Sequence, residues 1–340
     1  MKSYKKIPKL IGNMEMREWI LKNRVIIVLV FLVIVSTIMS PHFLTITNLF
    51  NILRQYSLYI LMAIGMLFVL LTGGIDLSQG SIVGICGLTL AITQTSWGWG
   101  EQNGLGLLMS ILLCVAVGMT FGAFNGLLIA YGNMLPFIVT LATSTVGRGI
   151  CYLLSNSRPV RLMKTNNSSK LLMHIASKGD PVLGFPYGAT VAIVFVLIFA
   201  WILKYTKYGR MTIATGSNSS AVRFAGIDVK KYTFYPYVLS GVFAALAGII
   251  LTGRTANATV DAGTGYEFDV IAGCIIGGAS LNGGRGSVLY SAIGMLTLAL
   301  ITNILNLLSL GAAPQQIIKG IIILVAVFMS DSLKKKNATE

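Results

Sequence analysis

Long apolar segments recur along almost the whole of this 340-residue chain, and they constrain its fold more than any other feature. Hydrophobic residues make up 55% of the sequence and charged residues only 11%, whereas a soluble domain carries about 25% charged residues. A soluble fold of this size could not bury so much apolar surface. The sequence therefore predicts an all-α polytopic membrane protein, because segments of this length and apolarity are typical of transmembrane helices.

About ten of the apolar segments are long enough, or nearly long enough, to cross a bilayer as a helix. Several are short or are interrupted by glycine. The expected spans are residues 25–40, 57–72, 82–95, 106–131, 134–154, 187–203, 233–252, 267–282, 287–308 and 316–330. Residues 25–330 are thus expected to form a single transmembrane domain in the lipid bilayer, preceded by a basic segment at 1–24 and followed by a basic tail at 331–340.

The net charge of +15 is unevenly distributed, and its distribution predicts the orientation of the chain. Lysine and arginine concentrate in residues 2–24, in a hydrophilic loop at 204–232 and in residues 334–336. If the N-terminus is cytoplasmic, all three segments lie on the cytoplasmic side, as the positive-inside bias requires, and so does the C-terminus. Only the basic loop at 155–186 lies outside in this topology, and longer loops follow the bias less strictly. No nucleic-acid partner is expected, because no segment is long enough to form an exposed domain.

The stretch TGGIDLSQGS, residues 72–81, places Asp76 between two apolar runs. A carboxylate at membrane depth is costly and normally faces a cavity or a partner. The neighbouring glycines allow the helix to break, and Ser78 and Gln79 add hydrogen-bonding groups. Two interpretations stay open: the segment lines a permeation path, or it is a tight turn in which Asp76 or Ser78 caps the helix that starts near Ile82.

A second polar stretch, residues 261–287, carries Glu267 and Asp269 ahead of an apolar run. Two carboxylates two residues apart on a helix do not face each other, so a paired acid–base site is not expected. Acidic residues also favour a helix N-terminus. The sequence NGGRG in this stretch is not a phosphate loop, because that motif ends in Gly-Lys-[Ser/Thr] and the chain contains no Gly-Lys dipeptide.

No cofactor, metal site or enzymatic activity is expected from the sequence. The two histidines, His42 and His174, lie far apart, and the four cysteines form no C-x-x-C pair. If ATP drives this protein, a partner subunit has to bind it.

The chain also contains an internal similarity. NGLLIAYGNMLP (125–136) and NILNLLSLGAAP (303–314) share an asparagine eleven positions before a proline, an apolar run and a glycine shortly before that proline. An offset of five spans reverses the direction of the chain, so the two halves would be inverted repeats, with the permeant path at their interface. The candidates for residues along this path are Asp76, Ser78, Gln79, Asn125, Glu267, Asp269 and Asn303.

The hydrophilic loop at 208–232 is too polar to span and too patterned to be a simple linker. Ser217 or Asn218 is expected to cap a short helix that runs to Phe224 and is closed by Gly226. A short helix on the cytoplasmic face suggests a docking element. The alternative is a solvated loop stiffened by one helical turn.

Four stretches in the same order together resemble the permease subunits of ribose-type ABC sugar importers, over roughly residues 40–330. They are TNLFNIL (47–53), TGGIDLSQGS (72–81), the pattern GR…A.GSN..A…AGI.V (209–229) and AGTGYEFDVIA..IIGGASLNGGRGS (262–287). One departure is Gln79, where such permeases commonly have a small or apolar residue.

The resemblance implies a fold, partners and site residues. The fold is that of the cobalamin-importer class of permeases, with two subunits, identical or related, around one pathway. Two copies of a sugar-type ABC ATPase would dock below and an extracytoplasmic sugar-binding protein above. The residues that match the ATPase-coupling segment are Gly209, Arg210, Gly216, Asn218, Ala221, Gly226 and Ile227. The candidates for docking the binding protein are Arg158, Arg161 and Lys164.

The function expected from these features is that of the permease of an ATP-driven importer in the bacterial cytoplasmic (inner) membrane, which moves a ribose-like pentose or a hexose. An ion-coupled secondary sugar transporter is the alternative, with Asp76 and Glu267 as coupling carboxylates. The patterned loop at 208–229 argues against it, because a secondary carrier needs no ATPase dock. A membrane hydrolase that uses Asp76 would lack a base–nucleophile constellation.

Overall fold

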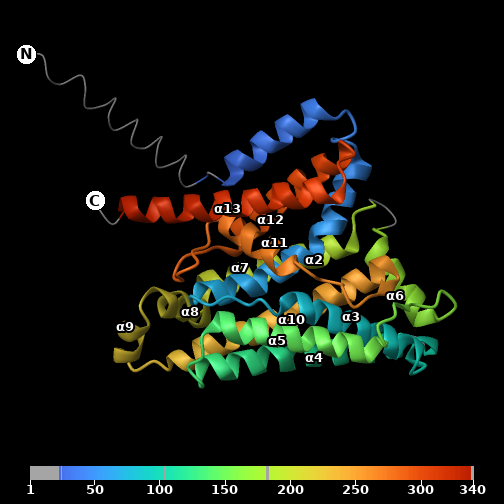
Figure 1. Ribbon diagram of the computed structural model, residues 1–340, viewed down its shortest axis with the longest axis horizontal. Coiled ribbons are helices and arrows are strands. Elements are labelled where there is room, and N and C mark those ends of the chain that lie inside the picture. Colours follow the sequence, from blue (N-terminus) through green and yellow to red (C-terminus); the bar gives the residue numbers. More distant parts are fainter. Residues whose placement is uncertain (1–22, 24, 103, 181–183, 338–340) are drawn as a thin grey trace, which may run out of the picture.

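The computed structural model describes residues 23, 25–102, 104–180 and 184–337, which form a bundle of long helices (Figure 1). Most of the expected basic N-terminal segment, and residues 338–340 of the tail, lie outside the described residues. A first helix, Val25–Met39, precedes the labelled elements. These are α2 (Ile46–Leu71), α3 (Gln79–Thr95), η1 (Trp99–Glu101), α4 (Leu105–Ala130), α5 (Pro136–Ser155), β1 (Val160–Arg161), α6 (Asn167–Ser177), α7 (Tyr187–Tyr205), α8 (Lys207–Ser217), α9 (Ser219–Phe224), α10 (Val229–Thr255), β2 (Asn257–Ala258), α11 (Tyr266–Ile276), α12 (Val288–Leu307) and α13 (Ala312–Asn337).

Six helices in the described part of the chain are long and apolar enough to cross a membrane: α2, α4, α5, α7, α10 and α12. This confirms the prediction of a helical polytopic membrane protein. In each of α4, α5 and α7, only 28% of the residues in the most apolar stretch of the helix are buried within the chain. The outer faces of these helices are therefore left for lipid or for another subunit.

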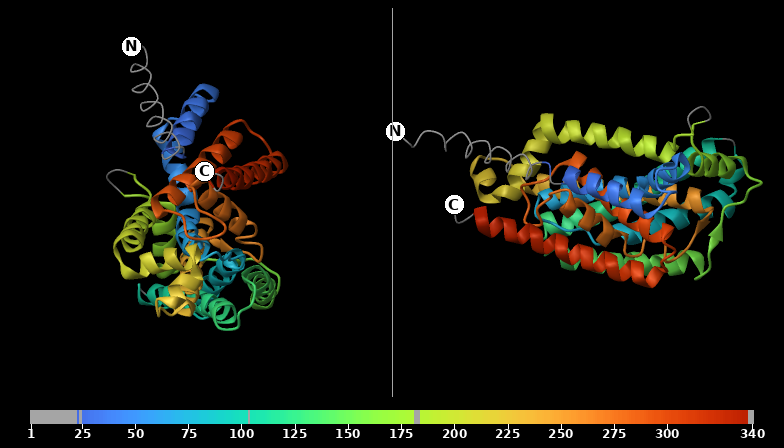
Figure 2. Two further views of the ribbon diagram at one scale, coloured as in Figure 1. Left: turned by 90° about the vertical axis from the view of Figure 1, so that its left-hand side faces the viewer. Right: turned by 90° about the horizontal axis from the view of Figure 1, so that it is seen from above.

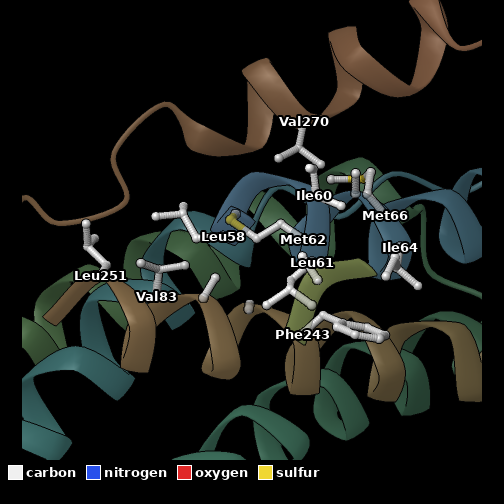
Figure 3. Packing of buried hydrophobic residues seen from close by; sticks show 14 of the residues in the cluster. Leu58, Ile60, Leu61, Met62, Ile64, Met66, Val83, Phe243, Leu251 and Val270 are labelled. Atoms are coloured by element: carbon white, nitrogen blue, oxygen red, sulfur yellow. The ribbon is translucent and has the colours of Figure 1, made fainter. Parts of the chain in front are cut away.

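Helix α2 is the centre of the bundle. In the most apolar stretch of α2, 78% of the residues are buried. Every residue from Ile60 to Leu71 is buried, as expected of a helix that is apolar on all sides. Figure 3 shows side chains from this helix, such as Leu61 and Met62, packed between Phe243 of α10 and Val270 of α11.

Small residues bring α4 and α10 close together. Gly118, Gly122 and Gly126 recur every fourth residue on α4 and therefore line one face. A β-carbon on Gly122 would lie 2.9 Å from the Cα of Val238, and one on Gly118 would overlap the carbonyl oxygen of Gly241. Glycines at this spacing let two helix backbones approach each other in a membrane.

One expected span is wrong in extent. The expected span at 267–282 is replaced by the 11-residue helix α11, which ends at Ile276 because Gly277 caps it and Gly278 takes a positive φ of 89°. The connecting segment 155–186 contains secondary structure of its own. It contains α6 and β1, and β1 pairs antiparallel with β2, with Val160 opposite Ala258.

The two ends of the bundle carry different structures. Helices α8 and α9 lie at the same end as the C-terminal end of α13, whereas α6 lies at the opposite end (Figure 1). Seen from above, α7 and α13 flank the molecule on opposite sides (Figure 2). The segment that contains α8 and α9 and the C-terminal end of α13 therefore lie at one end of the bundle.

Candidate functional site

The break between α2 and α3 is built from the glycines of TGGIDLSQGS. Helix α2 ends at Leu71, and Gly73 follows with a φ of 80°, a left-handed conformation that favours glycine. The amide of Gly73 donates to the carbonyl of Leu70 at 2.9 Å, which closes the helix end. Helix α3 then begins at Gln79, three residues before the expected start near Ile82.

Asp76 is completely buried and accepts three hydrogen bonds. Its Oδ1 accepts from the backbone amide of Ser78 at 2.9 Å and from the Ser78 hydroxyl at 2.6 Å, and its Oδ2 accepts from the Ser240 hydroxyl at 2.6 Å. Asp76 takes part in neither of the ion pairs Lys231–Asp228 and Lys319–Asp269, and all of its hydrogen-bond donors are neutral. Hydroxyl and amide dipoles, rather than a cation, therefore satisfy this carboxylate.

The hydrogen bonds around Asp76 continue into a network that joins four helices. Gln79 donates from Nε2 to Ser240 of α10 at 2.8 Å and to the Met62 carbonyl of α2 at 3.1 Å. Asn125 of α4 donates to the Ser78 hydroxyl at 2.8 Å. Asp76, Ser78, Gln79, Asn125 and Ser240, which we call the Asp76 network, are each 0% exposed. The fold thus brings four of the sequence-predicted candidates together.

Two members of this region could not be found from local sequence. Ser240 reaches the network because α10 crosses α2 at Gly65, where a β-carbon would lie 2.7 Å from the Cα of Ser240. Tyr237, also fully buried, lies against Gly74, and a β-carbon there would overlap its hydroxyl. The glycines of the break therefore serve both turn geometry and close packing.

The two carboxylates of α11 face different neighbours, as their spacing predicts. Glu267 lies against Gly80 of α3, and its Oε2 atom is buried without a hydrogen-bond partner among the described residues. Asp269 pairs with Lys319 of α13 at 2.9 Å. Helix α11 therefore connects the region of the break with α13.

Asn303 is not part of the Asp76 network. Its side chain pairs with Asn48 of α2 through two amide hydrogen bonds of 3.0 and 2.8 Å. Asn125 and Asn303, which occupy matching positions in the internal similarity, thus have different partners: Ser78 for Asn125 and a second asparagine for Asn303.

The segment 204–232 folds into α8 and α9 with caps at both starts. Thr206 accepts from the amide of Gly209 at 3.2 Å, and Asn218 accepts from the amide of Ala221 at 2.9 Å, which confirms the expected cap of the short helix. Gly226 follows α9 with a φ of 74°. Phe224, at the end of α9, is 90% exposed.

Helix α8 touches the end of α2 directly. A β-carbon on Gly216 would overlap the carbonyl oxygen of Leu71 and would lie 2.8 Å from the amide nitrogen of Gly284. That amide donates to the same Leu71 carbonyl at 2.9 Å. Helix α8 is therefore in backbone contact with the last residue of α2, which precedes the break.

At the opposite end of the bundle, Arg158, Arg161 and Lys164 are all exposed. The backbone around them is fixed, since the amide of Leu162 donates to the Ala256 carbonyl at 3.0 Å beside the β1–β2 pair. These cations are therefore presented to solvent on an ordered support.

The described residues contain no cluster of three or more metal-ligating side chains, and the buried groups around Asp76 form hydrogen bonds with one another. A multi-pass helical bundle with a broken helix at its centre and a capped helix pair at one end has the features of a membrane transport protein.

Comparisons with known proteins define the family. Residues 48–327 match the family model described as "Branched-chain amino acid transport system / permease component", and the chain belongs to this family. It is 38% identical over 315 residues to the ribose import permease protein RbsC of Escherichia coli strain K12, covering 93% of this chain and 95% of that protein. Identity to RbsC of Bacillus subtilis strain 168 is 39% over 311 residues, or 91% and 92% of the two chains. The galactose/methyl galactoside import permease protein MglC of Salmonella typhimurium is 33% identical over 325 residues, or 93% and 95%. No solved structure matches the chain.

Proposed function

We propose that this chain is the transmembrane permease subunit of an ATP-driven ABC importer, which moves a monosaccharide across the cytoplasmic membrane. The observation that carries the proposal is the identity of 38–39% to ribose import permeases over more than nine-tenths of the chain. Other relatives of this chain are named as permease proteins for galactose, a hexose, and for xylose, a pentose. The chain itself makes no covalent change in the sugar.

In this proposal the chain has about ten spans in two inverted repeats, in the fold of the cobalamin-importer class. Residues 25–330 form the permease domain, and both termini are cytoplasmic. A second permease copy, identical or related, completes the path. The Asp76 network holds the broken helix beside this path, and Glu267 lies nearer to it. Asp269 and Asn303 hold neighbouring helices together.

Helices α8 and α9 are the proposed ATPase dock. The exposed Phe224 offers an apolar anchor, the adjacent Arg223 is exposed, and so is Arg210 on α8. The coupling residues Gly209, Asn218, Ala221, Gly226 and Ile227 shape the two helices rather than forming a charged surface. Gly216 contacts Leu71, the last residue of α2. An ATP-driven movement of α8 would therefore be transmitted directly to the break between α2 and α3.

Co-purification tests the proposal. The tagged chain is expressed with its native partners, either intact or with residues 216–226 replaced by a flexible linker. We expect a sugar-type ATPase to purify with the intact chain and to be absent with the linker variant, because the linker removes α9 and the end of α8. If neither form binds an ATPase and the isolated chain takes up sugar under an ion gradient, a secondary carrier is the better description.

The exposed cations Arg158, Arg161 and Lys164 are the proposed contact for the sugar-binding protein. Single surface ion pairs contribute only about 0–1 kcal/mol, so the three residues are reversed to glutamate together. We expect the binding protein to associate more weakly with the permease, in a manner that depends on ionic strength. Reversal of the exposed residues Lys204, Lys207 and Arg210 at the other end is the control, and unchanged affinity for the binding protein in the outer triple variant would contradict the proposal.

A further inference from the structure

Arg148 is a charged residue of α5 that belongs to none of the candidate sites described above. It lies well inside a helix that is long and apolar enough to cross the membrane, where an arginine is costly and normally faces a partner or a water-filled cavity. It forms no ion pair with the described residues. Its presence inside a span therefore requires another explanation.

One nitrogen of Arg148 fixes the side chain to the segment between β2 and α11. Nη1 donates to the carbonyl oxygens of Val260 and of Ala262, the latter at 2.8 Å. Gly84 of α3 lies close to this contact, where a β-carbon would be 3.1 Å from both Nη1 and the Ala262 carbonyl oxygen. Nη2 and Nε donate no hydrogen bond within the described part of the chain, although an arginine carries five N–H donors. The guanidinium is thus oriented by one nitrogen and has donors to spare.

The spare donors belong to a polar stripe on the exposed side of α5. Thr145, Arg148 and Tyr152 are spaced i, i+3 and i+7, which places them on one face of the helix. Thr145 is exposed and Tyr152 is 49% exposed, and a β-carbon on Gly149 would meet nothing within 4 Å. The Thr145 hydroxyl donates to the Leu141 carbonyl at 3.1 Å, but the unused donors of the Arg148 guanidinium are unfavourable against lipid, so this face of the helix favours water or a bound polar molecule.

The other flank of α5 provides the contrast. Together with α4 it lines a groove of about 490 Å³ whose walls include Phe121, Phe124, Ile138 and Val146. That groove is almost entirely apolar and suits lipid or apolar protein surface. The two flanks of one helix are therefore chemically distinct, and only the flank of Arg148 suits a hydroxylated substrate.

We infer that Arg148 is a specificity-determining residue of the sugar path: Nη1 holds the guanidinium on the Val260–Ala262 segment, while Nη2 and Nε donate to sugar hydroxyls. Tyr152 offers an aromatic face to the apolar side of the sugar ring. The inference rests on the proposed function, since it names residues of the same path.

Cysteine accessibility tests whether the stripe faces water. The native cysteines, Cys86, Cys114, Cys151 and Cys274, are all buried, so the background reaction with a charged methanethiosulfonate reagent is low. Thr145→Cys and Tyr152→Cys are expected to react, whereas Leu153→Cys, which is 80% exposed on the other flank, is not. Failure of both stripe cysteines to react faster than Leu153→Cys would overturn the inference. This result does not depend on which energy source drives transport.

Transport by the complete importer tests the role of Arg148 itself. Arg148→Lys and Arg148→Gln are reconstituted with the ATPase and with a binding protein loaded with D-ribose. We expect D-ribose moved per ATP hydrolysed to fall about tenfold, because lysine cannot reproduce the oriented fork of donors. Thermal unfolding midpoints separate this loss from misfolding. Arg254→Lys is the matched control, since Arg254 also donates from Nη1 to two carbonyls, those of Arg54 and Gln55.

The outcomes distinguish the inference from the proposed function. If both Arg148 variants move as much D-ribose per ATP as the native chain, the inference is overturned, while the proposed importer function still stands. A native complex that hydrolyses ATP without moving D-ribose, D-xylose or D-galactose would overturn the proposed function, while cysteine labelling would still decide whether the stripe faces water.

Discussion

Replacement of Gly216 by alanine is expected to uncouple ATP hydrolysis from sugar transport. The added β-carbon would overlap the Leu71 carbonyl and press on the amide of Gly284, so α8 has to move away from the end of α2. Overpacking of this kind costs about 1–3 kcal/mol, and a coupling free energy of that size corresponds to about a 5- to 150-fold effect. We expect sugar uptake per ATP to fall by about tenfold or more.

The measurement for Gly216→Ala is uptake and ATP hydrolysis in the same proteoliposomes. The ATPase is expected to remain bound, because the docking surface around Phe224 is unchanged. Gly320→Ala is the matched control: it adds the same methyl group on α13, where a β-carbon meets nothing within 4 Å. Native coupling in Gly216→Ala would show that α8 does not act through its contact with Leu71.

The parts of this structure that local sequence predicts are those fixed by local chemistry. The break at residues 72–78 follows from its glycines, and the cap at Asn218 follows from its side-chain oxygen, which accepts a hydrogen bond from the nearby backbone amide of Ala221. Residue types and hydrophobicity also gave the approximate position of most helices. The expected span at 267–282 is longer than α11, which ends at Ile276. Because apolar residues continue on both sides of Gly277, the apolar pattern alone does not mark the end of the helix.

The parts that sequence reasoning missed depend on contacts between distant helices. Ser240 joins the Asp76 network only because Gly65 lets α10 approach α2, and a serine in an apolar run carries no sign of its partner. Two signals were nevertheless present. The glycines at every fourth position of α4 predict a close helix contact, and a single arginine inside the span at 134–154 marks a functional candidate.

Replacement of Asp76 by alanine is expected to destabilise the chain and to abolish most of its transport. The hydroxyls of Ser78 and Ser240 would each lose an acceptor in a fully buried site, at a cost of about 1–3 kcal/mol for each unsatisfied group. Because Asn125 and Gln79 are bonded to these two hydroxyls, the disturbance reaches α4 and α2 as well. We expect a lower thermal unfolding midpoint in detergent together with a fall in uptake of about tenfold.

Asparagine at this position separates the structural role of Asp76 from ion coupling. Asp76→Asn keeps an acceptor oxygen for Ser78, and its amide group can donate to Ser240, so most of the Asp76 network can persist. If Asp76 holds the break, the unfolding midpoint and ATP-driven uptake of Asp76→Asn both lie between those of the native chain and Asp76→Ala. If Asp76 instead couples sugar to an ion gradient, the amide cannot titrate, and uptake is lost while the midpoint stays near native. Glu101→Gln, an exposed carboxylate in η1, is the control for loss of a charge and is expected to change neither quantity.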